Sequence, residues 1–182
     1  MKRPARAITA KSLESAATFY IERYPSTAEG LRRVLGRHVR KAERAEAPIV
    51  VDVQRVIDGI VAKFVHAGVI DDKAFAQTKA RSLHRRGAST RLTRQKLKIA
   101  GIDSDTLDKA MAGLDQELDT DPQQREWQAA VALARRRRLG PFRQKDREQH
   151  RTRDLAAMGR AGFAYDLARK VIDAEERDII VP

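Results

Sequence analysis

Ala67-Gly68-Val69-Ile70-Asp71-Asp72 is the stretch that decides the fold, because shortened copies of it return twice later in the chain. The copies are Ala100-Gly101-Ile102-Asp103 and Ala161-Gly162-Phe163-Ala164, and a basic segment precedes each of them. In every copy an alanine and a glycine stand before an apolar residue, and a new amphipathic pattern follows. Recurrence of this kind is typical of an array of similar helical modules.

Amphipathic helices are expected along almost the whole chain from Ser12 onward. The clearest pattern covers residues 53–65, where apolar side chains follow the i, i+3, i+4, i+7 spacing and Gly68 then ends the helix. No stretch alternates apolar and polar residues for long enough to indicate a strand. We therefore expect an all-α fold built from tandem three-helix repeats.

The helical patterns divide into three expected repeats. Their boundaries are 12–69, 70–118 and 119–178, preceded by a flexible basic tail at 1–11. Ser12 is the expected cap of the first helix, Pro48 the expected start of the third, and Asp71 with Asp72 the expected caps of the fourth. A small unit buries little apolar surface alone, so stacking is expected to stabilise the repeats.

The charge balance of the chain points to an anionic partner. There are 37 lysines and arginines against 25 aspartates and glutamates in 182 residues, which gives a net charge of +12. Such a surplus favours nucleic acid or an acidic protein surface, and a merely solvated basic surface is the alternative. Aromatic residues make up only 5% of the chain, so a platform for stacking bases is not expected.

The strongest local signal is the segment 79–98, which contains many basic residues and no acidic one. A solvated helix normally mixes the two signs, so this segment predicts contact with an external anion. Of the run Arg135–Arg138, at most two residues can face one partner, because successive helical residues point to different sides. For His84, contact with a phosphate and plain solvation remain equally open. The candidate partner-binding or DNA-binding residues are Arg81, Arg85, Arg86, Arg91, Arg94, Lys98, Arg135, Arg136, Arg137, Arg138 and Arg143.

Catalytic and metal sites are not expected. The chain has no cysteine, which fits a reducing cytoplasm, and its four histidines are scattered without metal-ligand spacing. It has neither a glycine-rich phosphate loop nor a set of nucleophile and base, and Asp71 and Asp72 are better explained as helix caps than as ligands. No apolar run is long enough to predict a membrane span. We expect a non-enzymatic cytoplasmic protein without a metal or a cofactor.

A longer stretch around the first copy is more distinctive. It is Ala-Gly-Val-Ile-Asp-Asp-Lys-Ala-Phe-Ala at 67–76, followed by Ala80-Arg81, Arg86-Gly87, Ser89, Leu97 and Gly101-Ile102. Here the chain resembles the middle unit of the RecX family of regulators of the RecA recombinase. Two further stretches resemble the family more loosely. The family's first unit is similar to Tyr20-Ile21-Glu22-Arg23-Tyr24-Pro25-Ser26 with Leu31-Arg32-Arg33-Val34-Leu35. The third unit of its α-proteobacterial branch is similar to Arg136-Arg137-Arg138-Leu139-Gly140-Pro141-Phe142-Arg143 with Gly162-Phe163.

The resemblance, which covers about residues 12–175, implies an elongated, curved array of three-helix repeats. We expect the protein to act as a monomer. Members of the family bind RecA, free or as a filament on DNA, and inhibit its ATPase, strand-exchange and co-protease activities. They thereby modulate homologous recombination, DNA repair and the SOS response. Two questions stay open: whether the basic residues contact RecA or single- or double-stranded DNA, and whether the protein caps the filament or lies in its groove. The alternative function is a sequence-specific DNA-binding transcription regulator with a helix in the major groove.

Overall fold

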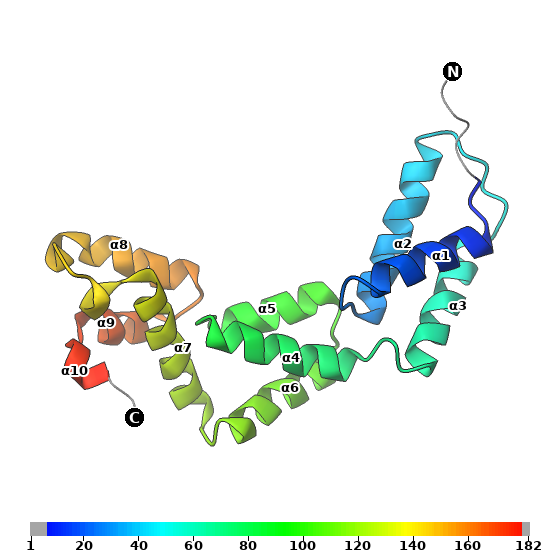
Figure 1. Ribbon diagram of the computed structural model, residues 1–182. Coiled ribbons are helices and arrows are strands. Elements are labelled where there is room, and N and C mark those ends of the chain that lie inside the picture. Colours follow the sequence, from blue (N-terminus) through cyan, green and yellow to red (C-terminus); the bar gives the residue numbers. More distant parts are fainter. Residues whose placement is uncertain (1–6, 180–182) are drawn as a thin grey trace. The chain divides into compact units, whose positions relative to one another are not determined.

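The computed structural model describes residues 7–179, and that part of the chain is helical and contains no strand (Figure 1). The expected all-α fold of tandem three-helix repeats is confirmed. The helices are α1 (Ala10–Ile21), α2 (Ala28–Glu43), α3 (Val53–His66), α4 (Asp72–Arg85), α5 (Thr90–Ala100), α6 (Ser104–Glu117), α7 (Pro122–Arg137), the 3-10 turn η1 (Gly140–Phe142), α8 (Arg147–Arg160), α9 (Tyr165–Asp173) and α10 (Glu176–Ile179).

The chain divides into two compact units. The first runs to Phe75 and also includes Ala100–Ile102, and the second consists of Ala76–Ile99 and the chain from Asp103 onward. The helices fall in the order that the three expected repeats require, α1–α3, α4–α6 and α7–α9. The division into three separate repeats at 69/70 and 118/119 stays a prediction, because the two compact units do not coincide with it.

In the first unit, α1, α2 and α3 pack against one another around one apolar core. Leu13 of α1 and Leu31 and Leu35 of α2 are fully buried there, and Val61 of α3 is almost so. These residues stand at the spacing that places them on one face of each helix. The clear periodicity of residues 53–65 therefore reports a helix that really is amphipathic and half buried.

The chain enters the first unit earlier than the sequence indicates. Ile8 is buried, its N–H donates to the carbonyl of Pro48 at 2.8 Å, and its carbonyl accepts from the N–H of Val50 at 3.2 Å. Thr9 and Ser12 then form a reciprocal capping box, with Thr9 as the cap of α1. The expected flexible tail is therefore wrong for residues 7–11, as is the expectation of Ser12 as the cap; residues 1–6 of that tail lie outside the described residues.

The starts of α3 and α4 differ in part from the expectation. The helix predicted to begin at Pro48 begins at Val53, because Asp52 accepts from the N–H of Arg55 and caps it. Asp71 caps α4 as expected, since its Oδ1 accepts from the N–H groups of Lys73 and Ala74. Asp72 does something else: its Oδ1 accepts from the N–H of Ala28 at 2.9 Å, so it satisfies a free amide at the start of α2.

The second unit contains the rest of α4 together with α5 to α10. Its larger core is formed by α7, α8 and α9, where Leu133, Met158, Val171 and Ile172 are buried. Trp127 packs on this core and is partly buried. The helices α4, α5 and α6 contribute their own buried side chains, Ala76, Ala80, Leu83, Leu97, Leu107, Ala110, Met111 and Leu114.

The alanine carbonyl of the Ala-Gly motif accepts the same kind of hydrogen bond in both units, from the hydroxyl of a helix-capping residue, and we call this contact the joint. In the first unit, Thr27, the cap of α2, donates its hydroxyl to the carbonyl of Ala100. In the second unit, Ser89, just before α5, donates its hydroxyl to the carbonyl of Ala161 at 2.8 Å. The motif therefore recurs because its carbonyl and its glycine turn dock on a hydroxyl that caps a helix about 70 residues earlier.

Candidate polyanion-binding surface

Three of the predicted binding residues are neutralised within the second unit. Arg81 Nε lies 2.6 Å from Glu117 Oε2, and Arg94 Nη2 lies 2.6 Å from Asp108 Oδ1. The carboxylates come from α6, so the acid-free segment 79–98 receives its counter-charges from another helix. Arg81 and Arg94 therefore have carboxylate partners within the second unit, and their contact with an external anion stays a prediction.

Arg143 is the third neutralised residue. It holds Asp154 with two hydrogen bonds, from Nη2 to Oδ1 at 2.7 Å and from Nε to Oδ2 at 3.1 Å, and Asp154 Oδ2 also accepts from the N–H of Gly140. Burial alone would raise the pKa of Asp154, but the guanidinium and the amide hold it below its usual value. Arg143 therefore anchors η1 to α8, and its role in binding a partner stays a prediction.

A pocket of about 430 Å³ brings together Arg86, Arg136 and Arg137, which form no ion pair with a carboxylate within residues 7–179. We call it the basic pocket. It is lined by Leu83, Arg86, Gly87, Ala88, Leu92, Lys96, Leu133, Arg136, Arg137, Arg160 and Ala161. The five cationic side chains are exposed, while Leu83, Ala88, Leu133 and Ala161 are buried. The basic pocket thus combines a cationic rim with an apolar floor.

The turn between α4 and α5 sits directly on α7, and this creates the basic pocket. Gly87 lies so close to α7 that a Cβ on it would stand 2.4 Å from the backbone nitrogen of Leu133. Only glycine fits this approach, which places Arg86 next to the last turns of α7. The joint between Ser89 and Ala161 then brings the end of α8, and with it Arg160, to the same place.

The run of four arginines divides as helical geometry requires. Arg136 and Arg137 line the basic pocket. Arg135 lies over the ring of Phe142, 5.3 Å from its centroid, and Arg138 ends α7 in the left-handed conformation at φ +52°. Two of the four side chains therefore reach the same pocket, which agrees with the upper limit that the sequence sets.

The remaining predicted residues are exposed. Arg85 and Lys98 have no acidic partner within the described residues, and neither has Arg91, whose Nε lies 3.4 Å from where a Cβ on Gly162 would stand. His84 is half buried, and burial followed by the charge of Arg125 lowers its pKa. The two roles that the sequence left open for His84, contact with a phosphate and plain solvation, stay predictions.

Sequence reasoning missed Lys96 and Arg160. Lys96 belongs to the acid-free basic segment 79–98 but was not among the candidate binding residues. Arg160 comes immediately before the last Ala-Gly motif, and that motif is the signal that could have placed it beside Ser89. Both residues line the basic pocket and have no acidic partner within residues 7–179.

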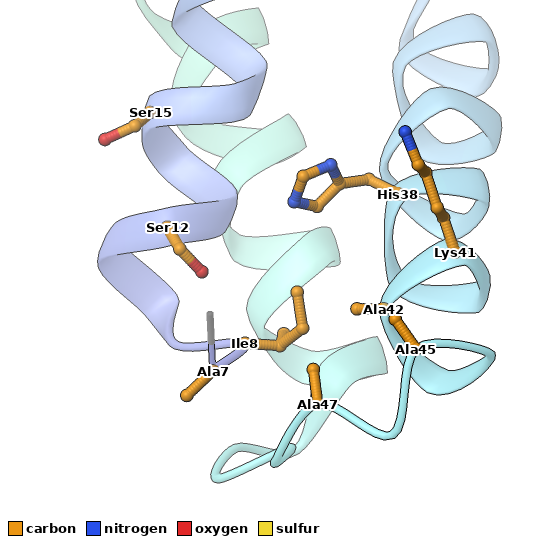
Figure 2. Close-up of a pocket in the computed structure, with 9 residues that line it drawn as sticks. All are labelled: Ala7, Ile8, Ser12, Ser15, His38, Lys41, Ala42, Ala45 and Ala47. Atoms are coloured by element: carbon orange, nitrogen blue, oxygen red, sulfur yellow. The ribbon is translucent and has the colours of Figure 1, made fainter. Parts of the chain in front are cut away.

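A second pocket lies in the first unit, between α1 and α2 (Figure 2). It has about 490 Å³ and is walled largely by small side chains, with Ser12 and Ser15 on one side and His38 and Lys41 on the other. Its two basic groups come from a single helix. It therefore offers far less positive charge than the basic pocket.

Metal-binding clusters and membrane-spanning helices are both absent from residues 7–179. No group of three or more histidine or acidic side chains there is arranged to hold a metal ion. No helix within residues 7–179 combines the length and the apolar character that crossing a membrane requires.

Comparison with known proteins gives a consistent picture. Residues 71–111 match the family model for the second three-helix domain of RecX. The regulatory protein RecX of Myxococcus xanthus is 39% identical over 175 residues, which cover 95% of this chain and 90% of that protein. The regulatory protein RecX of Thermobifida fusca is 30% identical over 162 residues, with 83% of each chain covered.

Solved structures agree on the fold. The crystal structure of RecX from Lactobacillus salivarius superposes with a TM-score of 0.60 at 20% identity, covering 94% of this chain and 97% of that one. A second crystal structure of a regulatory protein RecX gives a TM-score of 0.55 at 19% identity, covering 91% and 72%.

Proposed function

Since this chain belongs to the RecX family, we propose that it is a regulatory protein that binds the RecA recombinase and its filament on DNA. Binding lowers the ATPase, strand-exchange and co-protease activities of RecA. The protein thereby modulates homologous recombination, DNA repair and the SOS response. It acts in the cytoplasm as a monomer, by occupying a surface rather than by catalysing a reaction.

The observation that carries the proposal is the set of unneutralised cations on the second unit. Acidic side chains of α6 compensate Arg81 and Arg94, yet nothing in the described chain compensates the five cations of the basic pocket. Like charges held together repel, so an external anion stabilises this arrangement. A filament of protein on DNA presents phosphates as well as acidic side chains, and either would serve.

The decisive experiment measures ATP hydrolysis by RecA on single-stranded DNA while this protein is added. The expected result is a progressive loss of turnover that saturates as the protein covers the filament. A matched binding measurement with the same single-stranded DNA and no RecA separates sequestration of DNA from action on the filament. Undiminished turnover at a several-fold molar excess over RecA would contradict the proposal.

No observation favours the transcription regulator over this function. Such a regulator needs a recognition helix with several side chains free to reach base edges. On α5, the best candidate, Arg94 is bound to Asp108 and Arg91 lies against the turn at Gly162. That helix therefore offers a poor base-reading face.

A further inference from the structure

We propose that the basic pocket is a binding site for the backbone of single-stranded nucleic acid, with consecutive phosphates on its rim and the intervening sugar on its floor. The inference rests on the proposed function only in that the partner complex contains nucleic acid. It assigns the ligand of a site that combines residues from α4, α5, α7 and α8.

Charge is the first argument. Arg86, Lys96, Arg136, Arg137 and Arg160 line the basic pocket, and no acidic residue lies among its lining. Four of the five are arginines, whose planar guanidinium forms two parallel hydrogen bonds to one phosphate. Protein–DNA interfaces are much more positively charged than protein–protein interfaces. The lining therefore favours phosphates over the carboxylates of another protein.

Shape is the second argument. A cavity of about 430 Å³ is within the size range of small-ligand sites, roughly 300–1,000 Å³, and holds about one nucleotide unit. A duplex keeps its backbone in a fixed helical geometry, so it cannot rotate a sugar out onto the floor between two phosphates that contact the rim. A single strand can, which favours a single-stranded ligand.

The floor of the basic pocket is the third argument. Leu83, Leu92 and Leu133 offer an apolar surface beneath the cations, which suits the carbon atoms of a sugar between two phosphates. No aromatic side chain lines the pocket, so bases are not stacked and the strand is held through its backbone. Binding of this kind is independent of sequence and steeply dependent on salt.

The test uses the full chain and a fluorescent 20-nucleotide oligothymidine, with the dissociation constant measured by anisotropy at several salt concentrations. The pocket variant carries Arg136→Gln, Arg137→Gln and Arg160→Gln. The control variant, Arg153→Gln, Arg169→Gln and Lys170→Gln, loses the same charge from exposed residues of the same unit that lie outside the pocket. A second pocket variant, Arg86→Gln with Lys96→Gln, removes cations contributed by other elements. Circular dichroism establishes that each variant is folded.

We expect the triple pocket variant to bind the strand at least about tenfold more weakly, with a salt slope reduced by about 2, since each phosphate contact on a single strand contributes about 0.7. The second pocket variant weakens binding in the same direction, and the control changes affinity by less than about twofold. Crosslinking with an iodouracil-substituted strand should label peptides of α7 and of the α4–α5 turn.

Three results would overturn the inference. Equal weakening of the pocket and control variants would show that only net charge matters. Displacement of the strand by equimolar ATP would identify the ligand as a free nucleotide. Unchanged affinity for the strand together with lost inhibition of RecA would assign the pocket to carboxylates of RecA. Because the binding assay contains no RecA, a protein that binds the strand through the pocket but leaves RecA unaffected would refute the proposed function alone.

Discussion

The hydroxyl of Ser89 donates a hydrogen bond to the carbonyl of Ala161 at 2.8 Å, and the same oxygen accepts from the N–H of Leu92 at 3.1 Å. One side chain therefore caps the start of α5 and satisfies a carbonyl at the end of α8. Thr27 makes the same two hydrogen bonds in the first unit: its hydroxyl oxygen accepts from the N–H of Gly30, and its hydroxyl donates to the carbonyl of Ala100. The Ala-Gly motif is thus one half of a joint whose other half is a capping hydroxyl.

Replacing Ser89 by alanine should lower the free energy of unfolding by about 1–3 kcal/mol, because a helix cap is lost and a buried carbonyl is left without a donor. Urea unfolding followed by circular dichroism measures the change. Ser104→Ala is the control, since Ser104 is exposed and makes no side-chain hydrogen bond within the described residues. A loss no larger than that of the control would contradict the role assigned to Ser89.

Gly162→Ala should destabilise the protein by about 2–4 kcal/mol, since a side chain is strained in this conformation and has no room. Gly162 has φ +98°, and a Cβ there would stand 2.3 Å from Ser89 Oγ. Gly113→Ala, inside α6 with nothing within 4 Å, should instead stabilise by about 0.5–1 kcal/mol. Thermal unfolding of the two variants should move in opposite directions, and a shared direction would refute the explanation.

Asp154→Asn should lower the free energy of unfolding by about 2–4 kcal/mol at pH 7, because it breaks a pair in which the carboxylate is buried. The pKa of Asp154 is lowered in the folded protein, so its stabilising effect is fully present above about pH 4, the ordinary value. That effect disappears as the pH falls through the lowered pKa of the folded state. Urea unfolding of both proteins from pH 7 to pH 2 should therefore show the difference shrinking in acid.

The exposed pair of Asp105 and Lys109 provides the control for Asp154. Asp105 has 74% of its side chain exposed, and Asp105→Asn should change stability by less than about 0.5 kcal/mol at any pH. A constant difference between Asp154→Asn and the parent protein across the whole pH range would mean that lost packing, not charge, causes the destabilisation.

Inhibition of RecA should depend on where the cations lie in the second unit and not only on the net charge of the protein. Arg136→Gln with Arg137→Gln removes two cations of the basic pocket, whereas Arg81→Gln with Arg94→Gln removes two that are already bound to Glu117 and Asp108. The concentration for half-inhibition of RecA ATPase should rise roughly tenfold for the first variant and less than about twofold for the second. Equal effects would contradict the restriction of the binding surface to unneutralised residues.

The local features of the fold could be predicted from the sequence because they depend on neighbours in the chain. Apolar spacing located the helices, and Gly68 and Gly101 marked real helix ends, with φ of +69° and +91°. The segment at Ile8 was missed because its burial depends on Pro48 and Ile49, about 40 residues away. Apolar character in one isolated residue gives no signal of such a partner.

The candidate site was predictable in composition but not in geometry. The sequence identified the acid-free segment and the arginine run, and five of the predicted residues proved to lie outside both ion pairs and the basic pocket: Arg85, Arg91, Lys98, Arg135 and Arg138. It could not show that Glu117 reaches Arg81, 36 residues away. Nor could it show that Arg86 and Arg160 line the same cavity, because that follows from the Ser89 joint.

The turn at Gly68 differs from the turns at the other two copies of the motif, because nothing in residues 7–179 packs on it. It has the same left-handed conformation as Gly101 and Gly162, but within the described chain no atom lies within 4 Å of a Cβ placed on it. Half of a docking surface is therefore present there, unoccupied in residues 7–179. Within those residues Gly68 therefore ends α3 without the hydrogen-bonded joint that accompanies Gly101 and Gly162.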